Sequence, residues 1–99
     1  MEKNLNIENL EKIVIMLYQN HEKNGLENIS ELLSTLQEVI GRIPKNNQEE
    51  SSAFVIEMLN ELVKAYNMKD MIGLADCVKQ KVTMFMQYYS LLEEKGKII

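Results

Sequence analysis

The sequence is poor in the residues that build most disulfide, metal and redox sites. Its 99 residues include one cysteine, one histidine, one proline, four glycines and no tryptophan. A single cysteine excludes an intrachain disulfide, and no second thiol is present to complete a metal or redox pair. So little glycine and proline disfavours a loop-rich fold. The chain must therefore be held together by an apolar core, and 45% of its residues are hydrophobic.

No group of residues in the sequence suggests an enzyme or a cofactor site. His21 is preceded at the third position by Tyr18, so the Glu-x-x-His motif of metal sites in helical bundles is missing. No general base accompanies Ser51 or Ser52, so neither is a candidate nucleophile. The four glycines are isolated and do not form a phosphate-binding loop. We therefore predict a protein that is not an enzyme and that binds neither a metal ion nor a cofactor.

Length and charge limit the number of domains and the kinds of partner. A chain of 99 residues fits one domain, which we place at 1–99 with flexible ends at 1–5 and 96–99. The net charge is −4 and the basic residues do not cluster, which disfavours nucleic acid and anionic membranes as partners. No signal-peptide pattern opens the chain, and no apolar run approaches the roughly 20 residues that span a bilayer. We expect a cytoplasmic protein.

Apolar residues recur with the 3-4 spacing of amphipathic helices, and no strand-like alternation occurs. Short connections favour antiparallel neighbours, so we predict an all-α, up-down-up-down four-helix bundle. The predicted helices and their boundary signals are a first helix after the N-cap Asn6, ended by Asn24–Gly25; a second over Glu27–Arg42; a third over Gln48–Tyr66, with Asn47 and Glu50 as a capping box; and a fourth over Met71–Lys95, between the N-cap Asp70 and Gly96.

The spacing also predicts which side chains face the core. In the third helix these are Phe54, Val55, Met58, Leu59, Leu62, Val63 and Tyr66. In the fourth helix they are Ala75, Val78, Val82, Phe85, Tyr89 and Leu92.

The fourth helix carries more apolar surface than packing in a bundle requires. At about 100° per residue, the polar side chains between Val82 and Leu92 form a stripe about 60° wide, and the apolar ones cover about 220°. A helix on a globular core needs an apolar stripe of little more than about 100°. This helix is therefore either central in its bundle or offers one face to a partner. The predicted partner-binding residues are Met71, Met84, Met86, Tyr88 and Leu91.

The methionines and the single cysteine each allow two interpretations of their role. The methionines on the third and fourth helices suit both irregular gaps in a core and a surface that accepts varied partners. Cys77, next to Val78 in a helical pattern, is interpreted as a buried structural thiol, with a reactive or regulatory thiol as the alternative.

Two segments resemble flagellin-export chaperones of bacterial type III secretion. The string EKIVIMLY at Glu11–Tyr18 is similar to one near the start of that family's first long helix. A looser likeness runs from Ala65–Asp70 into Met71–Tyr89, which resembles the junction between the family's last two long helices. The sequence departs from the family at Gln19–Asn20, where the family has Asp-Gly, and at Tyr88–Tyr89, where a tryptophan is often found.

The resemblance implies a small cytoplasmic antiparallel bundle that shields an aggregation-prone helical terminus of a client protein until export. In such a role, an apolar helix of the client would bind in a groove beside the exposed apolar face of the fourth helix. It would dock against Met84, Met86, Tyr88 and Leu91. The alternative is a structural bundle without a client, in which the same face pairs with a second copy across a two-fold axis.

Overall fold

The structure, a computed structural model, describes residues 7–19 and 21–97. These residues form helices and contain no strand, so the all-α prediction is confirmed. Of the ends predicted to be flexible, 1–5 and 98–99 lie outside the described residues. The elements in chain order are α1 (Ile7–Tyr18), α2 (Glu22–Gly41), α3 (Lys45–Asn67), α4 (Met71–Cys77), the π-helical segment η2 (Val78–Val82) and α5 (Thr83–Glu94).

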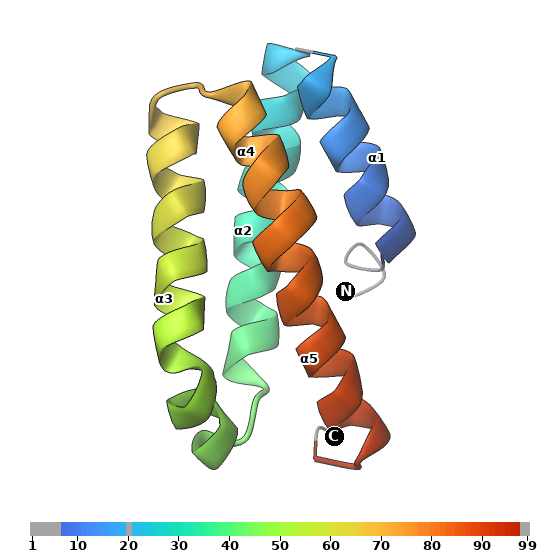
Figure 1. The fold of residues 1–99 in the computed structure, drawn as a ribbon, viewed down its shortest axis with the longest axis vertical. Helices are drawn as coiled ribbons and strands as arrows, with labels where there is room; N and C mark the ends of the chain where they lie inside the picture. The colour runs from blue at the N-terminus through green and yellow to red at the C-terminus, as the bar shows by residue number, and fades with distance from the viewer. Residues whose placement is uncertain (1–6, 20, 98–99) are drawn as a thin grey trace.

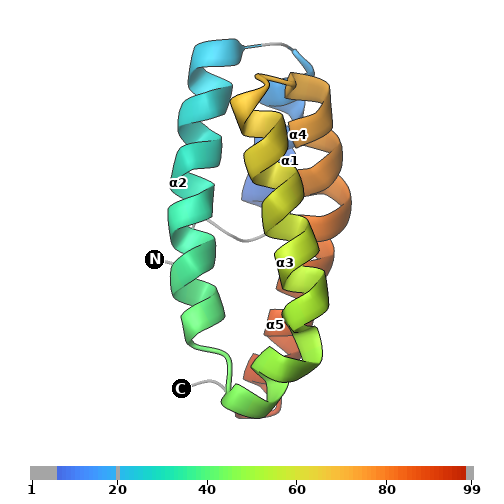
Figure 2. The same cartoon turned by 90° about the vertical axis from the view of Figure 1, so that its left-hand side faces the viewer.

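The helices lie side by side along the long axis of a molecule that measures 38 × 24 × 19 Å (Figures 1 and 2). The segments α4, η2 and α5 follow one another as a single column (Figure 1). In the upper half, α1 packs against α2 and α4, and α3 packs against the same two helices. Because α1 has only 12 residues, it stops about half way down, and α2, α3 and α5 make the lower half (Figure 1).

One continuous core runs through both halves of the molecule. All six core positions predicted for the fourth helix are buried, and the two aromatic residues among them, Phe85 and Tyr89, are the largest fully buried side chains. Val63 was predicted to face the core but is 45% exposed, because it lies about 100° around α3 from the fully buried Leu62. The apolar pattern thus located the core of α4–η2–α5 more accurately than that of α3.

The predicted N-cap Asn6 lies outside the described residues, and the predicted end of the first helix is wrong. The sequence predicts that this helix ends at Asn24–Gly25, but α1 already ends at Tyr18, and Gly25 lies in the first turn of α2. Gly25 is buried, and a Cβ atom there would come within 2.9 Å of Leu17 Cδ2 and 3.6 Å of Met71 Sδ. Glycine is therefore needed here because α2 approaches α1 and α4 closely. The sequence alone does not distinguish such a glycine from one that ends a helix.

The third helix starts earlier than predicted. Pro44 is its N-cap and fixes the entry of the chain, so the helix begins at Lys45. Asn47 and Glu50 therefore do not form a capping box. They lie inside the helix, where the Asn47 amide donates a hydrogen bond to the Glu50 carboxylate over 3.1 Å.

Two helices end in the same backbone motif. After α5, Gly96 has a φ of 73°, and the N–H of Lys97 donates to the carbonyl of Leu92 over 3.0 Å. After α3, the N–H of Asp70 donates to the carbonyl of Ala65 over 2.9 Å, and the residue in the left-handed position is Lys69, with a φ of 54°. Both are Schellman motifs, and the predicted stop at Gly96 is confirmed.

The predicted N-cap of the last column is also confirmed. The Asp70 carboxylate accepts a hydrogen bond from the N–H of Gly73 over 2.9 Å. The turn between α3 and α4 therefore combines the C-cap of α3 and the N-cap of α4 within a few residues. In this turn Lys69 adopts a left-handed backbone conformation, which is unfavourable for a residue with a Cβ atom.

Replacing Lys69 with glycine is expected to raise the free energy of unfolding by about 0.5–1 kcal/mol, because glycine adopts a positive φ without the steric cost of a Cβ atom. Little is lost with the side chain, since the Lys69–Glu22 ion pair is 4.0 Å long and exposed on both sides. Urea unfolding of the variant measures the change, and Lys69→Ala is the matched control, which removes the same ion pair but keeps the Cβ atom. Equal stability of the two variants would contradict the backbone explanation.

Candidate functional site

The structure buries most of the wide apolar arc of the fourth helix. Of the eight apolar side chains between Val82 and Leu92, five are buried and Tyr88 is half-buried. Met84 and Leu91 remain, with 58% and 53% of their surfaces exposed. This column packs against both α1 and α3, which accounts for most of its apolar surface.

The five predicted partner-binding residues divide between core and surface. Met71 and Met86 are buried in the core, with 6% and 7% of their surfaces exposed, so neither is available to a partner. Met84, Tyr88 and Leu91 lie together on one side of α5 because their 4-3 spacing repeats nearly every two turns. The candidate site is therefore narrower than the sequence predicts.

These three residues belong to a stripe that runs along the α3 side of the last column. Lys81 begins it, and its ammonium group lies 3.3 Å from a carboxylate oxygen of both Glu57 and Glu61 on α3. These two hydrogen bonds raise the pKa of Lys81. The paired charges join η2 to α3 at the upper end of the stripe, and the apolar part follows below them.

A groove of about 300 Å³ lies between α3 and α5 at Met84. Its apolar walls come from Phe54 of α3 and from Met84, Phe85 and Tyr88 of α5. Glu50 and Ser51 of α3 complete the lining. Phe54, a predicted core residue, is half-buried: it packs against the core and also lines this groove. We call the surface formed by Phe54, Met84, Tyr88 and Leu91 the α3/α5 surface.

Hydrogen bonds fix the position of the aromatic ring in this surface. The Tyr88 hydroxyl donates to the Glu50 carboxylate over 2.9 Å and lies 3.4 Å from the Asn47 carbonyl. Burial, and then the hydrogen bond to Glu50, raise the pKa of Tyr88. The hydrogen bonds from Tyr88 and Asn47 lower the pKa of Glu50. The ring is thus held by its polar end, and its apolar face lines the groove.

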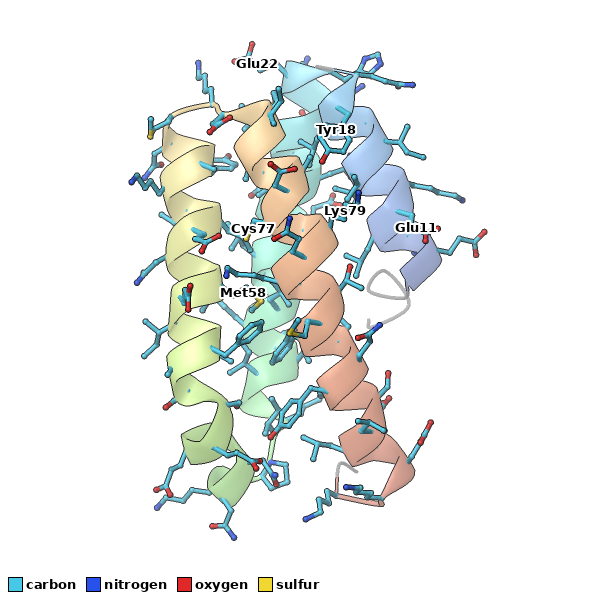
Figure 3. All side chains as sticks on the ribbon, viewed as in Figure 1. Glu11, Tyr18, Glu22, Met58, Cys77 and Lys79 are labelled. Atoms are coloured by element: carbon cyan, nitrogen blue, oxygen red, sulfur yellow. The ribbon has the colours of Figure 1, made fainter. Side chains whose placement is uncertain are left out.

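A second groove lies on the other side of the column, between α1 and η2. It is lined by Leu10, Val14, Ile15 and Tyr18 of α1 and by Lys79 and Thr83, with Glu11 at its edge. Figure 3 shows Tyr18 and Lys79 between α1 and the last column. The Tyr18 hydroxyl donates to the Asp76 carboxylate over 2.5 Å, and this bond is the main reason why the pKa of Tyr18 is raised.

The π-helical segment separates these two surfaces. The backbone N–H and the hydroxyl of Thr83 both donate to the carbonyl of Val78, five residues earlier, the hydroxyl over 3.1 Å. Such wide turns occur often at functional sites of helices. Here the turn directs Lys81 to α3 and leaves Lys79 and Thr83 on the groove beside α1.

Cys77 is the buried thiol that the sequence pattern favours. Its side chain is 4% exposed, and Sγ lies 3.8 Å from the carbonyl oxygen of Met58 on α3 (Figure 3). Burial, and next the negative charge of Glu61, raise its pKa from the usual 9.0 to about 12. A thiol in this state forms almost no thiolate near neutral pH and is a poor nucleophile.

Residues 7–19 and 21–97 contain no group of three or more histidine, cysteine, aspartate or glutamate side chains that could hold a metal ion. His21 is exposed at the start of α2. The hydroxyls of Ser51 and Ser52 bond to the backbone carbonyls of Asn47 and Glu49, one helical turn earlier. None of the described helices is long and apolar enough to cross a membrane.

The structure also exposes apolar residues that sequence reasoning missed. Ile56 on α3 and Ile72 on α4 are 58% and 62% exposed. Ile56 could have been found from the sequence, because it lies about 160° around the helix from Met58 and about 120° from Leu62, well away from the core positions of α3. Comparison of the chain with protein-family models, with curated proteins and with solved structures finds no match.

Proposed function

We propose that this chain is a protein-binding, antiparallel up-down-up-down four-helix bundle. Its role is that of a cytoplasmic chaperone or co-chaperone, similar to those of flagellin export, and its client is an amphipathic helix. The client helix docks on the α3/α5 surface. The observation that carries the proposal is the groove between α3 and α5, where Met84 is exposed beside the half-buried Phe54 and Tyr88.

The dimensions of this surface suit a helix. Met84 and Leu91 are seven residues apart, which corresponds to about 10 Å, or two turns, along α5. A client helix with apolar residues at i, i+3, i+4 and i+7 presents a stripe of the same length. Contact with two exposed apolar side chains and an aromatic ring supplies about 25 cal/mol for each Å² of apolar surface that is buried. Polar groups at the rim, such as the Glu50 carboxylate, favour one orientation of the client.

The hydrogen-bonded tyrosine supports the same role. Because Glu50 and Asn47 already hold the Tyr88 hydroxyl, the ring loses little side-chain freedom when a client binds. The binding site is then largely formed before the client arrives. An exposed methionine next to a fixed ring also suits a surface that accepts apolar side chains of different shapes.

The test is calorimetric titration with a peptide of the C-terminal helix of a flagellin. We expect the double variant Met84→Asp and Leu91→Asp to bind the peptide at least tenfold more weakly than the unchanged chain, because each carboxylate must be desolvated against an apolar helix. The matched control is Ile72→Asp. Ile72 is as exposed as Met84 but lies on α4, away from the groove, so this variant should bind as the unchanged chain does.

Two results would contradict the proposal. One is unchanged peptide binding by the double variant, with its helical circular dichroism intact. The other is no binding by the unchanged chain together with a dimer that the double variant abolishes. That second result would support the structural alternative, in which the α3/α5 surface pairs with a second copy.

A further inference from the structure

The longest helix, α3, carries apolar side chains on the side that faces away from the core. Ala53, Ile56, Asn60 and Val63 fall within an arc of about 80°, and its centre is about 160° around the helix from the centre of the buried positions. All four residues are exposed. A shallow hollow follows this face, lined by Ala53, Ile56, Glu57, Asn60, Glu61 and Lys64. The α3/α5 surface does not include these residues.

The spacing along this outer face is that of a coiled-coil seam. The steps from Ala53 through Ile56 and Asn60 to Val63 are three, four and three residues, the repeat of core positions in a two-stranded coiled coil. A single asparagine among apolar core positions is a recurring device that fixes register and oligomeric state at some cost in stability. We call these four residues the outer seam.

The charges beside the outer seam differ between its two flanks. One flank carries Glu50, Glu57 and Lys64, and the other carries Ser52, Leu59 and Tyr66, which have no charge. In a parallel pair of identical helices, each flank faces the opposite flank of its partner, so charged groups would face uncharged ones. In an antiparallel pair, like flanks face each other. Glu57 of one copy then lies opposite Lys64 of the other, twice across the two-fold axis.

We propose that the outer seam binds a second copy of this chain, α3 against α3, in antiparallel orientation. The charge pattern favours this occupant, because the same helix in reverse orientation supplies both attractive pairs. In this register Asn60 and Val63 flank the two-fold axis, and the two Asn60 amides lie within about one helical turn of each other. On the uncharged flank, the half-buried Leu59 and Tyr66 face the same residues of the second copy.

The dimer is weak and does not compete with the client. The seam is about three turns long, and an interface of this size buries less than about 1,200 Å², which is typical of transient contacts. Glu57 also pairs with Lys81 of its own chain, but its side chain remains 60% exposed and accessible to a second copy. The α3/α5 surface stays open in the dimer, because the two faces of α3 point in different directions.

The test is sedimentation equilibrium of the full chain between about 10 µM and 1 mM. We expect a mass that rises from monomer toward dimer, at least tenfold tighter association for Asn60→Leu, and a monomer at all concentrations for Val63→Glu. Met84→Asp is the control and should dimerise as the unchanged chain does. A monomer throughout, including Asn60→Leu, would overturn the proposal, and so would a dimer that Met84→Asp abolishes.

A charge exchange tests the orientation. Lys64→Glu and Glu57→Lys should each dimerise poorly alone, since like charges then face each other twice. An equimolar mixture should form a heterodimer, because both opposite-charge pairs are restored in it. Glu57→Lys should remain folded, as Lys81 keeps Glu61 as a partner at 3.3 Å. No association in the mixture would overturn the antiparallel arrangement. Peptide binding by monomeric Val63→Glu tests the chaperone role separately, so the two proposals can fail independently.

Discussion

Replacing Phe85 with alanine is expected to lower the free energy of unfolding by about 3–5 kcal/mol, a large part of the stability of a domain of this size. Phe85 is 1% exposed and lies near the start of α5, within the continuous core. Removing the ring leaves a cavity that the surrounding helices cannot easily close. Urea unfolding followed by circular dichroism measures the loss.

The adjacent residue provides a matched control. Met84→Ala removes a side chain that is 58% exposed, and we expect it to change the free energy of unfolding by no more than about 0.5 kcal/mol. Both residues belong to the same apolar arc, so the sequence pattern alone would not separate them. If Phe85→Ala does not fold, Phe85→Leu leaves a smaller cavity and should show a smaller loss. Equal losses at positions 84 and 85 would contradict the packing of α5.

The second large effect is a loss of stability at alkaline pH that originates from Cys77. Its pKa rises from the usual 9.0 to about 12 in the folded state, so both folded and unfolded chains keep the thiol proton below pH 9. Between pH 9 and pH 12 only the unfolded chain releases it. The contribution of the buried thiol is therefore fully present below pH 9. Above it, the free energy of unfolding should fall by about 1.4 kcal/mol per pH unit, or about 4 kcal/mol in all.

Cys77→Ala isolates this contribution, because alanine has no proton to lose. Tyr89 acts in the same direction, since burial raises the pKa of its hydroxyl, which has no hydrogen-bond partner among the described residues. Tyrosines and lysines titrate in both proteins, so the informative quantity is the difference between the two stabilities at each pH. We expect this difference to shift steadily in favour of the variant between pH 9 and pH 11. Parallel stability curves would show that the thiol ionises without unfolding.

The helices could be predicted from sequence because burial follows the 3-4 spacing closely in α2 and in the last column. The boundaries at Asp70 and Gly96 could be predicted because a side chain or a glycine there acts on its own backbone. The prediction that Gly25 ends a helix is wrong because the need for glycine comes from a contact with another helix. Leu17 of α1 occupies the space that a Cβ atom at position 25 would need. The Schellman turn at Lys69 gives no sequence signal, since lysine is a rare residue in that position.

The candidate site could be predicted only in part. The apolar arc on the fourth helix indicated excess surface, and Met84 and Tyr88 line the groove between α5 and α3, with Leu91 on the same side of α5. Which part of the arc remains exposed depends on how α3 packs, and Met86 is buried although it is only two residues from Met84. Phe54 and Glu50 join the site from a distant segment, a juxtaposition that periodicity within one helix does not contain.

The π-helical turn has a consequence for insertions and deletions. A turn closed by a bond over five residues holds one residue more than an α-helical turn, so α5 is rotated by about 100° from a straight continuation of α4. Deleting one residue between 78 and 82 would remove this extra residue, so the column could run as an ordinary α-helix while α4 and α5 both keep their contacts. Phe85 and Tyr89 would then stay in the core, and α5 would present the same face to a partner.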